Sequence, residues 1–396
     1  MLRRLASFAA VLAAVALQTP SGASAHIQAS IRSGAATSKG VNLGGWLVTE
    51  HWMTTEEAFW SGVDSSTLNS GEYSVISNSS DPTAMRTAID NHHSTFITEA
   101  DIEAIAAAGL NTVRVPVGWW IVGFDNSDPS GKAEWKTYPT KTIQYLDTLI
   151  TEWAYTHNVA VLISLHAAKG SQNGAEHSSP DSPGNAYWSS YNENVANTIE
   201  AASFLAARYK NEDAFLGIGL LNEPNSNTDQ TVLYQYYEDA YAAIRDDGND
   251  CVLSIMPLLY EQGPDQLQGV LEAPAYTNVW VEWHPYFVWG YESTSGDDLI
   301  NVSIPAMQAQ LTTWNARKSH NRLLMGEWSL ATASGQFSSD TSAFYEFAAA
   351  QLAAMNEAEG GWTFWSWKSS GDSSGLNGWS LRSLVADSTL AGMITA

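Results

Sequence analysis

Short apolar runs recur along the chain and alternate with longer segments that have a helical period. Eight such runs, rich in β-branched and other apolar residues, cover residues 40–46, 111–117, 159–166, 215–223, 251–257, 278–286, 322–328 and 361–367. Strands buried on both faces of a parallel sheet have this nearly continuous apolar character. The pattern therefore predicts a parallel sheet covered by helices rather than a sheet with one solvated face.

The segments between these runs predict amphipathic helices. Apolar residues recur at i, i+3 and i+4 in residues 98–110, 140–158, 192–210, 231–248 and 341–361, which is the spacing of a helix with one buried face. The first of these segments opens with a capping-box pattern from Thr98 to Asp101 and closes at Gly109. Since helical segments lie between several of the strands, the pattern predicts α/β architecture.

Eight strand and helix units in 396 residues predict a single (β/α)8 TIM barrel. An open doubly wound sheet is the alternative, but it requires a glycine-rich phosphate loop after an early strand. The first run, "GVNLGGW", lacks that G-x-G-x-x-G spacing. We interpret the Ser- and Gly-rich residues 61–80 as a surface excursion after the first strand.

The first 25 residues have the features of a secretory signal. Arg3 and Arg4 precede an apolar stretch from Leu5 to Leu17, and the small residues 23–25 follow. A membrane anchor is the alternative, but this apolar stretch is too short to span a bilayer. We therefore expect cleavage after residue 25, a barrel domain over residues 26–396, and an extracellular or cell-wall location. Asn78 and Asn301 stand in N-x-S sequons and would be glycosylation acceptors in a host that glycosylates secreted proteins.

The net charge of the chain limits the kinds of molecule that it is expected to bind. The chain has 42 acidic side chains against 18 Lys and Arg, a net charge of −24. Nucleic acids and anionic membranes bind basic patches, so neither is expected as a partner, and we expect a monomer.

Cys251 is the single cysteine and opens an apolar run, which favours a buried strand thiol. Without an internal disulfide, stability must come from a large core.

Polar and aromatic residues stand at or just beyond the ends of most predicted strands. In a TIM barrel the carboxyl ends of the strands converge on the face that carries the active site. A single residue of this kind is explained by a hydrogen-bonded core polar group, but contributions from seven strands are not. The residues are Glu50, Arg114, His166, Asn222, Glu223, His284, Tyr286, Glu327 and Trp365.

Glu223 and Glu327 share a setting, since each ends an apolar run and neither has a lysine or cysteine beside it. Two carboxyl groups at strand ends suit acid/base and nucleophilic chemistry on a glycosidic bond. One must keep a proton and the other must stay ionised, and Arg114 and Tyr286 are candidates to stabilise the ionised Glu327. Pro224 disfavours the helical region for the preceding residue, so we expect an extended Glu223. Strict alternation would then place Asn222 on the opposite face.

The aromatic content agrees with a sugar ligand, because aromatic rings stack on the apolar faces of pyranoses. Most of the 17 tryptophans and 16 tyrosines are expected in the core. Trp52, Trp289 and Trp365 are the exceptions by position, at or just after strand ends. The adjacent histidines at 92–93 lack the spacing of a metal site, and no G-x-S-x-G elbow of a serine hydrolase occurs. No metal or cofactor is expected.

With these residues in place, the chain resembles the family 5 glycoside hydrolases of clan A, and among them the secreted exo-β-1,3-glucanases of yeasts and other fungi. The resemblance runs from about Gly40 to about Lys368. It rests on the ordered segments "GVNLGGWLVTE", "HHSTFITEADIEAIAAAGLNTVRVPVGWW", "LISLHAAKGSQNG", "GIGLLNEPN", "VEWHPYFVW", "MGEWS" and "GGWTFWSWK".

The resemblance implies a role for each candidate residue and a retaining reaction without a cofactor. Glu223 would be the acid/base and Glu327 the nucleophile. Five residues fall on positions that orient the two glutamates and contact the sugar, namely Arg114, His166, Asn222, His284 and Tyr286. Glu50 and Trp365 match positions that bind the sugar in the first subsite.

The chain also departs from these enzymes. Its single cysteine cannot form their disulfides, and of the two aromatics that gate their cleft it has Ala175 at the first position and Trp289 at the second. We expect a secreted retaining β-glucanase that acts on β-1,3-glucan and releases glucose from chain ends. Endo-action, cleavage of β-1,6 or β-1,4 linkages, and glucosyl transfer stay open. A secreted glucan-binding protein without catalysis is the alternative from another class.

Overall fold

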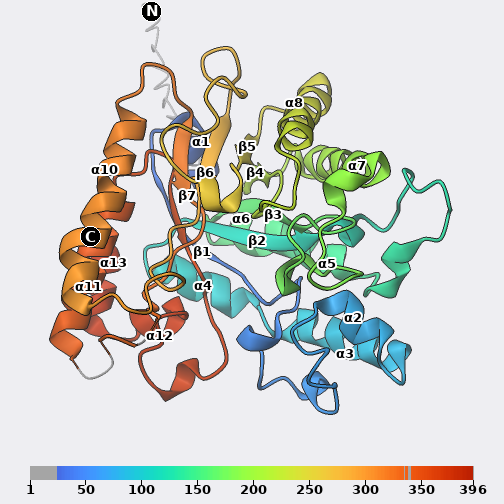
Figure 1. The fold of residues 1–396 in the computed structure, drawn as a ribbon, viewed down its shortest axis with the longest axis horizontal. Helices are drawn as coiled ribbons and strands as arrows, with labels where there is room; N and C mark the ends of the chain where they lie inside the picture. Colours follow the sequence, from blue (N-terminus) through green and yellow to red (C-terminus); the bar gives the residue numbers. More distant parts are fainter. Residues whose placement is uncertain (1–24, 334, 338–339, 396) are drawn as a thin grey trace, which may run out of the picture.

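The computed structural model describes residues 25–333, 335–337 and 340–395. The predicted signal, apart from Ala25, lies outside these residues. Eight parallel strands form a closed barrel in sequence order (Figure 1). They are β1 Ser38–Asn42, β2 Thr112–Gly118, β3 Ala160–Ala167, β4 Phe215–Gly219, β5 Val252–Ile255, β6 Val279–Trp283, β7 Arg322–Met325 and β8 Gly361–Phe364. The predicted TIM barrel is confirmed.

Burial on both faces explains why the strands read as continuous apolar runs. Every residue of β2 and of β3 is buried, because the barrel interior covers one face and the helices cover the other. The barrel closes where β8 pairs with β1, with Ser38 opposite Gly361. All eight predicted strands are present, but most end earlier than the apolar run predicts. β4, for example, ends at Gly219, so Glu223 lies beyond the strand.

The helices that separate the strands surround the barrel (Figure 1). The predicted capping box at Thr98 and Asp101 is present at the start of its helix. The predicted helix over 140–158 is interrupted by a π-helical segment, Leu149–Trp153. The helices are α4 Glu99–Ala107, α5 Thr142–Thr148, α6 Ala154–Thr156, α7 Asn192–Tyr209, α8 Gln230–Asp246, α9 Gly296–Asp298, α10 Ile304–Asn315 and α11 Thr341–Met355.

One short helix closes the barrel at the end where the strands begin. Helix α1, Ile27–Ser33, places Ile31 against the first residues of several strands, among them Leu162, Leu216 and Trp280. Ile31 is 1% exposed. At the other end of the chain, α12 Leu381–Val385 and α13 Ser388–Thr395 pack together, and α13 packs on α11. The opposite end of the barrel, where the strands finish, is left to the long connections.

The connection after β1 is more than a surface excursion. It contains α2 Glu72–Ser77 and α3 Pro82–Thr95, which lie together at the lower right of Figure 1. The expectation of a surface excursion over 61–80 was wrong for α2, because Ile76 packs in a buried cluster with Val48 and Ile89. Composition misled here, because Val75 and Ile76 of α2 are buried although the stretch as a whole is rich in Ser and Gly.

Three smaller expectations concern burial. Cys251 is buried next to β5, as predicted, and burial raises the pKa of its thiol to about 11. Both sequon asparagines, Asn78 and Asn301, are exposed. Within residues 25–333, 335–337 and 340–395, no helix combines the length and the hydrophobicity needed to cross a bilayer.

Candidate active site

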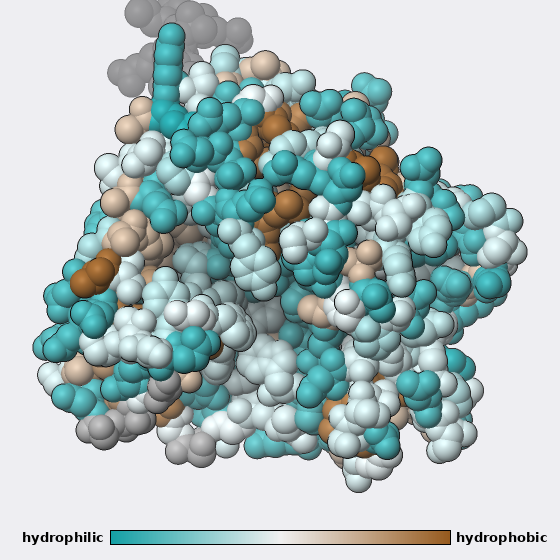
Figure 2. Space-filling model, in the orientation of Figure 1, coloured by the Kyte–Doolittle hydropathy of each residue, from teal (hydrophilic) through white to brown (hydrophobic). Residues whose placement is uncertain are grey.

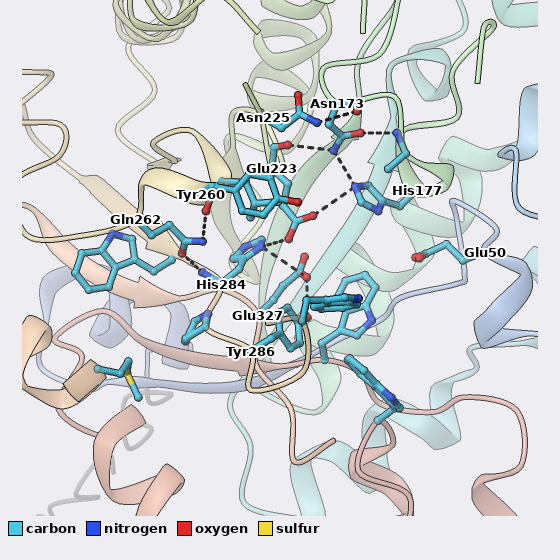
Figure 3. Close-up of a pocket in the computed structure, with 18 of the residues that line it drawn as sticks. Glu50, Asn173, His177, Glu223, Asn225, Tyr260, Gln262, His284, Tyr286 and Glu327 are labelled. Atoms are coloured by element: carbon cyan, nitrogen blue, oxygen red, sulfur yellow. Dashed lines mark hydrogen bonds and ion pairs between the residues drawn. The ribbon is translucent and has the colours of Figure 1, made fainter. Parts of the chain in front are cut away.

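A cavity of about 510 Å3 opens where the barrel strands end (Figures 2 and 3). Figure 2 shows a mainly hydrophilic face that is hollowed near its centre. Seven of the predicted site residues line the cavity, namely Glu50, Glu223, His284, Tyr286, Trp289, Glu327 and Trp365. The connections after the strands, rather than the strands themselves, supply most of the lining.

The two predicted glutamates face each other in this cavity. One carboxylate oxygen of Glu223, one of Glu327 and a ring nitrogen of His284 all lie within 4.8 Å of one another. Figure 3 shows these three side chains converging from different parts of the barrel. Side-chain exposure is 12% for Glu223 and 6% for Glu327, so both carboxyl groups are largely removed from water.

Each oxygen of Glu327 accepts a hydrogen bond. Arg114 Nη1 donates to Oε1 at 2.9 Å, and the Tyr286 hydroxyl donates to Oε2 at 2.9 Å. Burial raises the pKa of Tyr286 well above its usual range, and the Glu327 charge adds to this effect. Neither donor loses its proton near neutral pH, so Glu327 is held by two permanent donors.

Arg114 organises the residues behind the glutamates. It lies within β2, is 1% exposed, and donates from Nη1 to Asn42 at 2.8 Å and from Nη2 to the Asn222 side chain at 2.7 Å. Its Nε lies 2.8 Å from Oε1 of Glu282, which completes a buried ion pair. Because the guanidinium is planar with fixed donors, these partners set the position of the proton donor to Glu327.

Glu223 is bonded to a histidine that is itself paired with a second carboxylate. His284 Nδ1 lies 2.8 Å from Oε1 of Glu223, and His284 Nε2 lies 3.0 Å from Oε1 of Glu282. Burial alone would lower the pKa of His284, but Glu327, Glu223 and Glu282 outweigh it and raise that pKa to about 9. The ring is therefore an imidazolium near neutral pH and donates to both neighbours.

The pKa values of the two catalytic candidates are shifted in opposite directions. Burial raises the pKa of Glu327 to about 7, with the Glu223 carboxylate adding repulsion, while His284 and Arg114 oppose this. Burial also acts on Glu223, but the hydrogen bond and charge of His284 outweigh it and lower the pKa of Glu223. Groups this close titrate as a pair, so their surroundings decide which carboxyl group holds the proton during a reaction.

The backbone at Glu223 differs from the extended conformation that Pro224 led us to expect. Glu223 has φ of +47°, in the left-handed region. That region costs about 1–3 kcal/mol for a residue other than glycine. The surrounding peptide groups are held by hydrogen bonds, from Gln172 to the Asn222 carbonyl at 2.7 Å and from Asn173 to the Glu223 carbonyl at 3.0 Å. The turn brings Asn222 and Glu223 into the same network, which strict alternation would have prevented.

Three predicted residues do not line the cavity. Arg114 lies behind the glutamates and donates to Glu327, and Asn222 accepts a hydrogen bond from Arg114. His166 lies in β3, where its ring stacks on Trp365 at 5.5 Å between centroids. Burial lowers the pKa of His166 well below its usual range. The neutral ring thus supports Trp365, which faces the cavity.

An aromatic wall forms one side of the cavity. Trp379 lies 5.3 Å from Trp52, 5.6 Å from Tyr286 and 6.0 Å from Trp289 between ring centroids. Trp289 is 67% exposed and Trp52 is 39% exposed, so their faces are open to a ligand. Sequence reasoning missed Trp379, although it follows the eighth strand as Trp365 does.

Other residues of the site were also missed. Glu282 holds both Arg114 and His284, and its charge is stabilised by them, since burial alone would raise its pKa but these cations lower it to about 2. A lone carboxylate inside the apolar "VWVEW" was a signal that could have identified it. Further lining residues carried no such signal, among them Asn173, His177, Asn225, Tyr260 and Gln262.

Within the described part of the chain, one group of side chains has the spacing of a metal site, and it is the cluster of Glu223, His284 and Glu327. The imidazolium has no free nitrogen lone pair, so as arranged this is a hydrogen-bonded cluster rather than a ligand set. The adjacent histidines lie elsewhere in helix α3, and His92 Nε2 contacts the Gly45 carbonyl at 2.7 Å.

Comparisons with known proteins identify the family of the chain. Residues 76–371 match the family described as Cellulase (glycosyl hydrolase family 5). The chain belongs to glycosyl hydrolase family 5. The resemblance found in the sequence is thus confirmed, and the chain is an O-glycoside hydrolase by family.

Relatives within this family include fungal proteins. The chain is 31% identical to "Probable glucan 1,3-beta-glucosidase A" of Emericella nidulans over 88% of each chain. It is 29% identical to the protein of the same name from Aspergillus niger, over 88% of this chain and 86% of the relative. A "Glucan 1,3-beta-glucosidase" of Schwanniomyces occidentalis is 29% identical, over 83% of this chain and 82% of the relative.

Solved structures show the same fold at lower sequence identity. A rutinosidase from Aspergillus niger superposes with a TM-score of 0.74 at 17% identity, over 91% of this chain and 99% of that one. An endoglucanase from Thermotoga maritima superposes with a TM-score of 0.58, also at 17% identity, over 93% of this chain and 99% of the endoglucanase. At this identity the likeness concerns the barrel fold alone.

Proposed function

We propose that this family 5 chain is a secreted retaining β-glucanase that hydrolyses β-1,3-glucan. The observation that carries the proposal is the closeness of two buried carboxylates, with one oxygen of Glu223 and one of Glu327 within 4.8 Å. Retaining glycosidases hold these groups about 5–5.5 Å apart, whereas inverting ones leave about 6.5–9.5 Å for a water. The glucan 1,3-β-glucosidase names of the fungal relatives support the linkage.

Glu327 is the nucleophile in this proposal. Both of its oxygens accept hydrogen bonds from Arg114 and Tyr286, so a proton on Glu327 would displace one of these donors. The ionised carboxylate attacks the anomeric carbon, a glycosyl ester forms, and the bond to the leaving oxygen breaks. Arg114 stays bonded throughout and stabilises the carboxylate when it is released in the second step.

Glu223 is the acid/base. It supplies a proton to the leaving oxygen in the first step, and in the second it removes a proton from the water that attacks the glycosyl ester. His284 fixes one oxygen of Glu223 by the bond to Oε1 at 2.8 Å. The other oxygen, Oε2, is then the one that meets the substrate. Two carboxyl groups in unlike surroundings can divide the acid and nucleophile roles in this way.

Glu50 supports binding of a sugar hydroxyl at the first subsite. Its Oε2 accepts from Trp52 Nε1 at 2.9 Å, while its buried Oε1 has no hydrogen-bond partner among the described residues. Burial raises the pKa of Glu50 well above its usual range, with the Glu176 charge adding to it. A buried carboxyl group without a partner is costly, and a sugar hydroxyl beside Trp365 would satisfy it.

We propose exo-action with release of glucose, and the products formed from laminarin over time test it. Glucose as the first and main product supports exo-action on β-1,3-glucan. Mixed oligosaccharides from the start would show endo-action, and products longer than the substrate would show glucosyl transfer. Parallel assays on β-1,6- and β-1,4-glucans test the linkage. Laminarin binding without any released sugar would contradict hydrolysis itself.

Secretion is part of the proposal and has its own test. Cleavage after Ala25 would leave His26, whose ring accepts from the Gln28 backbone at 3.2 Å and thereby caps helix α1. The helix that closes the barrel would therefore remain whole. Expression in a secreting fungal host followed by N-terminal sequencing should give His26 as the first residue. An uncleaved chain retained in the cell would contradict the proposal.

A further inference from the structure

His177 approaches the acid/base candidate from a part of the chain that the sequence did not single out. It lies in the short 3-10 helix Glu176–Ser178 that follows β3, lines the cavity, and has 22% of its side chain exposed. Its Nε2 is 3.4 Å from Oε2 of Glu223 (Figure 3). This is the oxygen of Glu223 that His284 leaves unoccupied.

The hydrogen bonds of Asn173 decide which nitrogen of His177 carries the proton. Asn173 Oδ1 accepts from the Ala175 backbone N–H at 2.9 Å, which identifies the oxygen of the amide. Its Nδ2 therefore donates, to the Glu223 carbonyl at 3.0 Å and to His177 Nε2 at 2.9 Å. A nitrogen that accepts from an amide N–H must present a lone pair. His177 is thus neutral, with its proton on Nδ1.

The charged surroundings agree with a neutral ring. Burial lowers the pKa of His177, and the nearby cations His284 and Arg114 add to this, whereas Glu223 opposes it. The ring also meets His166 edge-on at 5.3 Å between centroids. Since His284 already supplies a cation to Glu223, a second cation at His177 would be repelled by the first.

Nε2 is the negative end of the neutral imidazole dipole, and it lies 3.4 Å from Oε2 of Glu223 while Asn173 occupies its lone pair. The neutral ring therefore disfavours the ionised form of Glu223 and accommodates the protonated one. A cationic His177 would act in the opposite direction and lower the pKa of Glu223. We propose that His177 is a positioning residue whose neutral ring, through the direction of its dipole, keeps the acid proton of Glu223 on Oε2, the oxygen that faces the substrate. At 3.4 Å the contact is too long to compete with a leaving glycosidic oxygen for that proton. The inference rests on the proposed role of Glu223 as acid/base.

The titratable and charged groups that face Glu223 come from five strands, so the test must separate their effects. They are Glu50 after β1, Arg114 in β2, His177 after β3, His284 and Tyr286 after β6, and Glu327 after β7. Only His177 is changed in the test. His177→Phe keeps a ring against His166 but removes both nitrogens, and His177→Leu is a second variant if the larger ring disturbs folding. His177→Gln restores an acceptor, because its amide oxygen can accept from Asn173.

The measurement is the pH dependence of kcat/KM on a phenyl β-glucoside, whose leaving group needs the acid. His177→Phe or His177→Leu should move the midpoint of the basic limb to lower pH by about one unit. His177→Gln should recover most of that shift. An unmoved limb, or one moved to higher pH as a cationic His177 would give, overturns the inference. A dinitrophenyl β-glucoside, which leaves without a proton, should show no such shift.

Azide rescue of Glu223→Ala distinguishes the two levels of the proposal. If azide restores turnover of an activated aryl glucoside and the basic limb is unmoved in the His177 variants, only the inference about His177 is wrong. If azide gives no rescue, Glu223 is not the acid/base and both fail. Thermal melting of each variant checks that the fold is retained.

Discussion

Arg114 Nη1 lies 2.9 Å from Oε1 of Glu327, although the two residues are 213 positions apart in the chain. The same guanidinium is paired with Glu282 at 2.8 Å through Nε. One buried cation thus compensates two buried carboxylates, and one of the two is the proposed nucleophile. The cost of burying these three charges is offset by their mutual attraction and by the polar side chains around them.

Arg114→Lys should reduce both activity and stability. A lysine keeps the charge but loses the planar set of donors, so it cannot serve Glu327 and Glu282 at once. We expect a loss in free energy of unfolding of roughly 3–5 kcal/mol, as for a broken buried pair, and a fall in kcat of about 100-fold or more. Urea unfolding and laminarin hydrolysis measure the two effects.

The matched control is Arg208→Lys, because Arg208 makes a two-pronged pair with Asp147 at the surface. Surface pairs contribute about 0–1 kcal/mol, so this variant should keep its activity and nearly all of its stability. Equal losses in both variants would mean that burial of the Arg114 network does not matter.

Glu223→Ala and Glu327→Ala should respond to azide in different ways. Loss of a general acid lowers the rate by about 100- to 10,000-fold on substrates with poor leaving groups. In Glu223→Ala, azide should attack the glycosyl ester and give the β-glucosyl azide. In Glu327→Ala, azide should replace the nucleophile directly and give the α-glucosyl azide. NMR of the azide product reads the anomeric configuration, and the reverse pattern would exchange the roles of the two glutamates.

Trp289→Ala should weaken binding of longer glucans without unfolding the protein. The ring is 67% exposed, and changes at exposed positions usually alter stability by no more than about 0.5 kcal/mol. Loss of an apolar stacking face should raise KM for laminarin oligosaccharides about fivefold to tenfold. KM for an aryl β-glucoside, which occupies less of the cavity, should change less. Tyr155→Ala, at an exposed ring 56% open to solvent and away from the cavity lining, is the control and should leave both KM values unchanged.

Glu72→Gln should stabilise the protein above about pH 5. Burial raises the pKa of Glu72 to about 7, with hydrogen bonds from Thr49 opposing this. Because the folded state keeps this proton while the unfolded state loses it near pH 4.5, the wild type loses stability as pH rises from about 4.5 to 7, by about 3 kcal/mol at most. The amide has no charge to lose, so its advantage should appear in this window and stay constant above it.

Melting temperatures of wild type and Glu72→Gln between pH 4 and 8 measure this effect. The amide oxygen can still accept both bonds from Thr49, at 3.1 Å each in the wild type. Glu103→Gln, at an exposed position of α4, should show no pH-dependent gain. A difference in melting temperature between wild type and Glu72→Gln that stays the same at every pH would contradict a raised pKa for Glu72.

The sequence by itself determined the barrel, because each buried strand and each helix shows a characteristic spacing of apolar residues. That spacing involves only residues close together in the chain. It also placed Glu223 and Glu327 at the same end of the barrel, since parallel strands bring their carboxyl ends together. The aromatic positions Trp289 and Trp365 followed from the same rule. These features depend on residues close in sequence and on the common direction of the eight parallel strands.

Tertiary structure alone decided how these residues act. The left-handed backbone at Glu223 is held by Asn173, 50 positions away, and the proton of His177 is assigned by the same side chain. The pairing of Glu282 with Arg114 joins β6 to β2. Local periods carry no information about such partners, because directed hydrogen bonds and charge pairs form only after the chain has closed. The sequence therefore located the candidate site, and contacts across the barrel set the charges and hydrogen bonds around it.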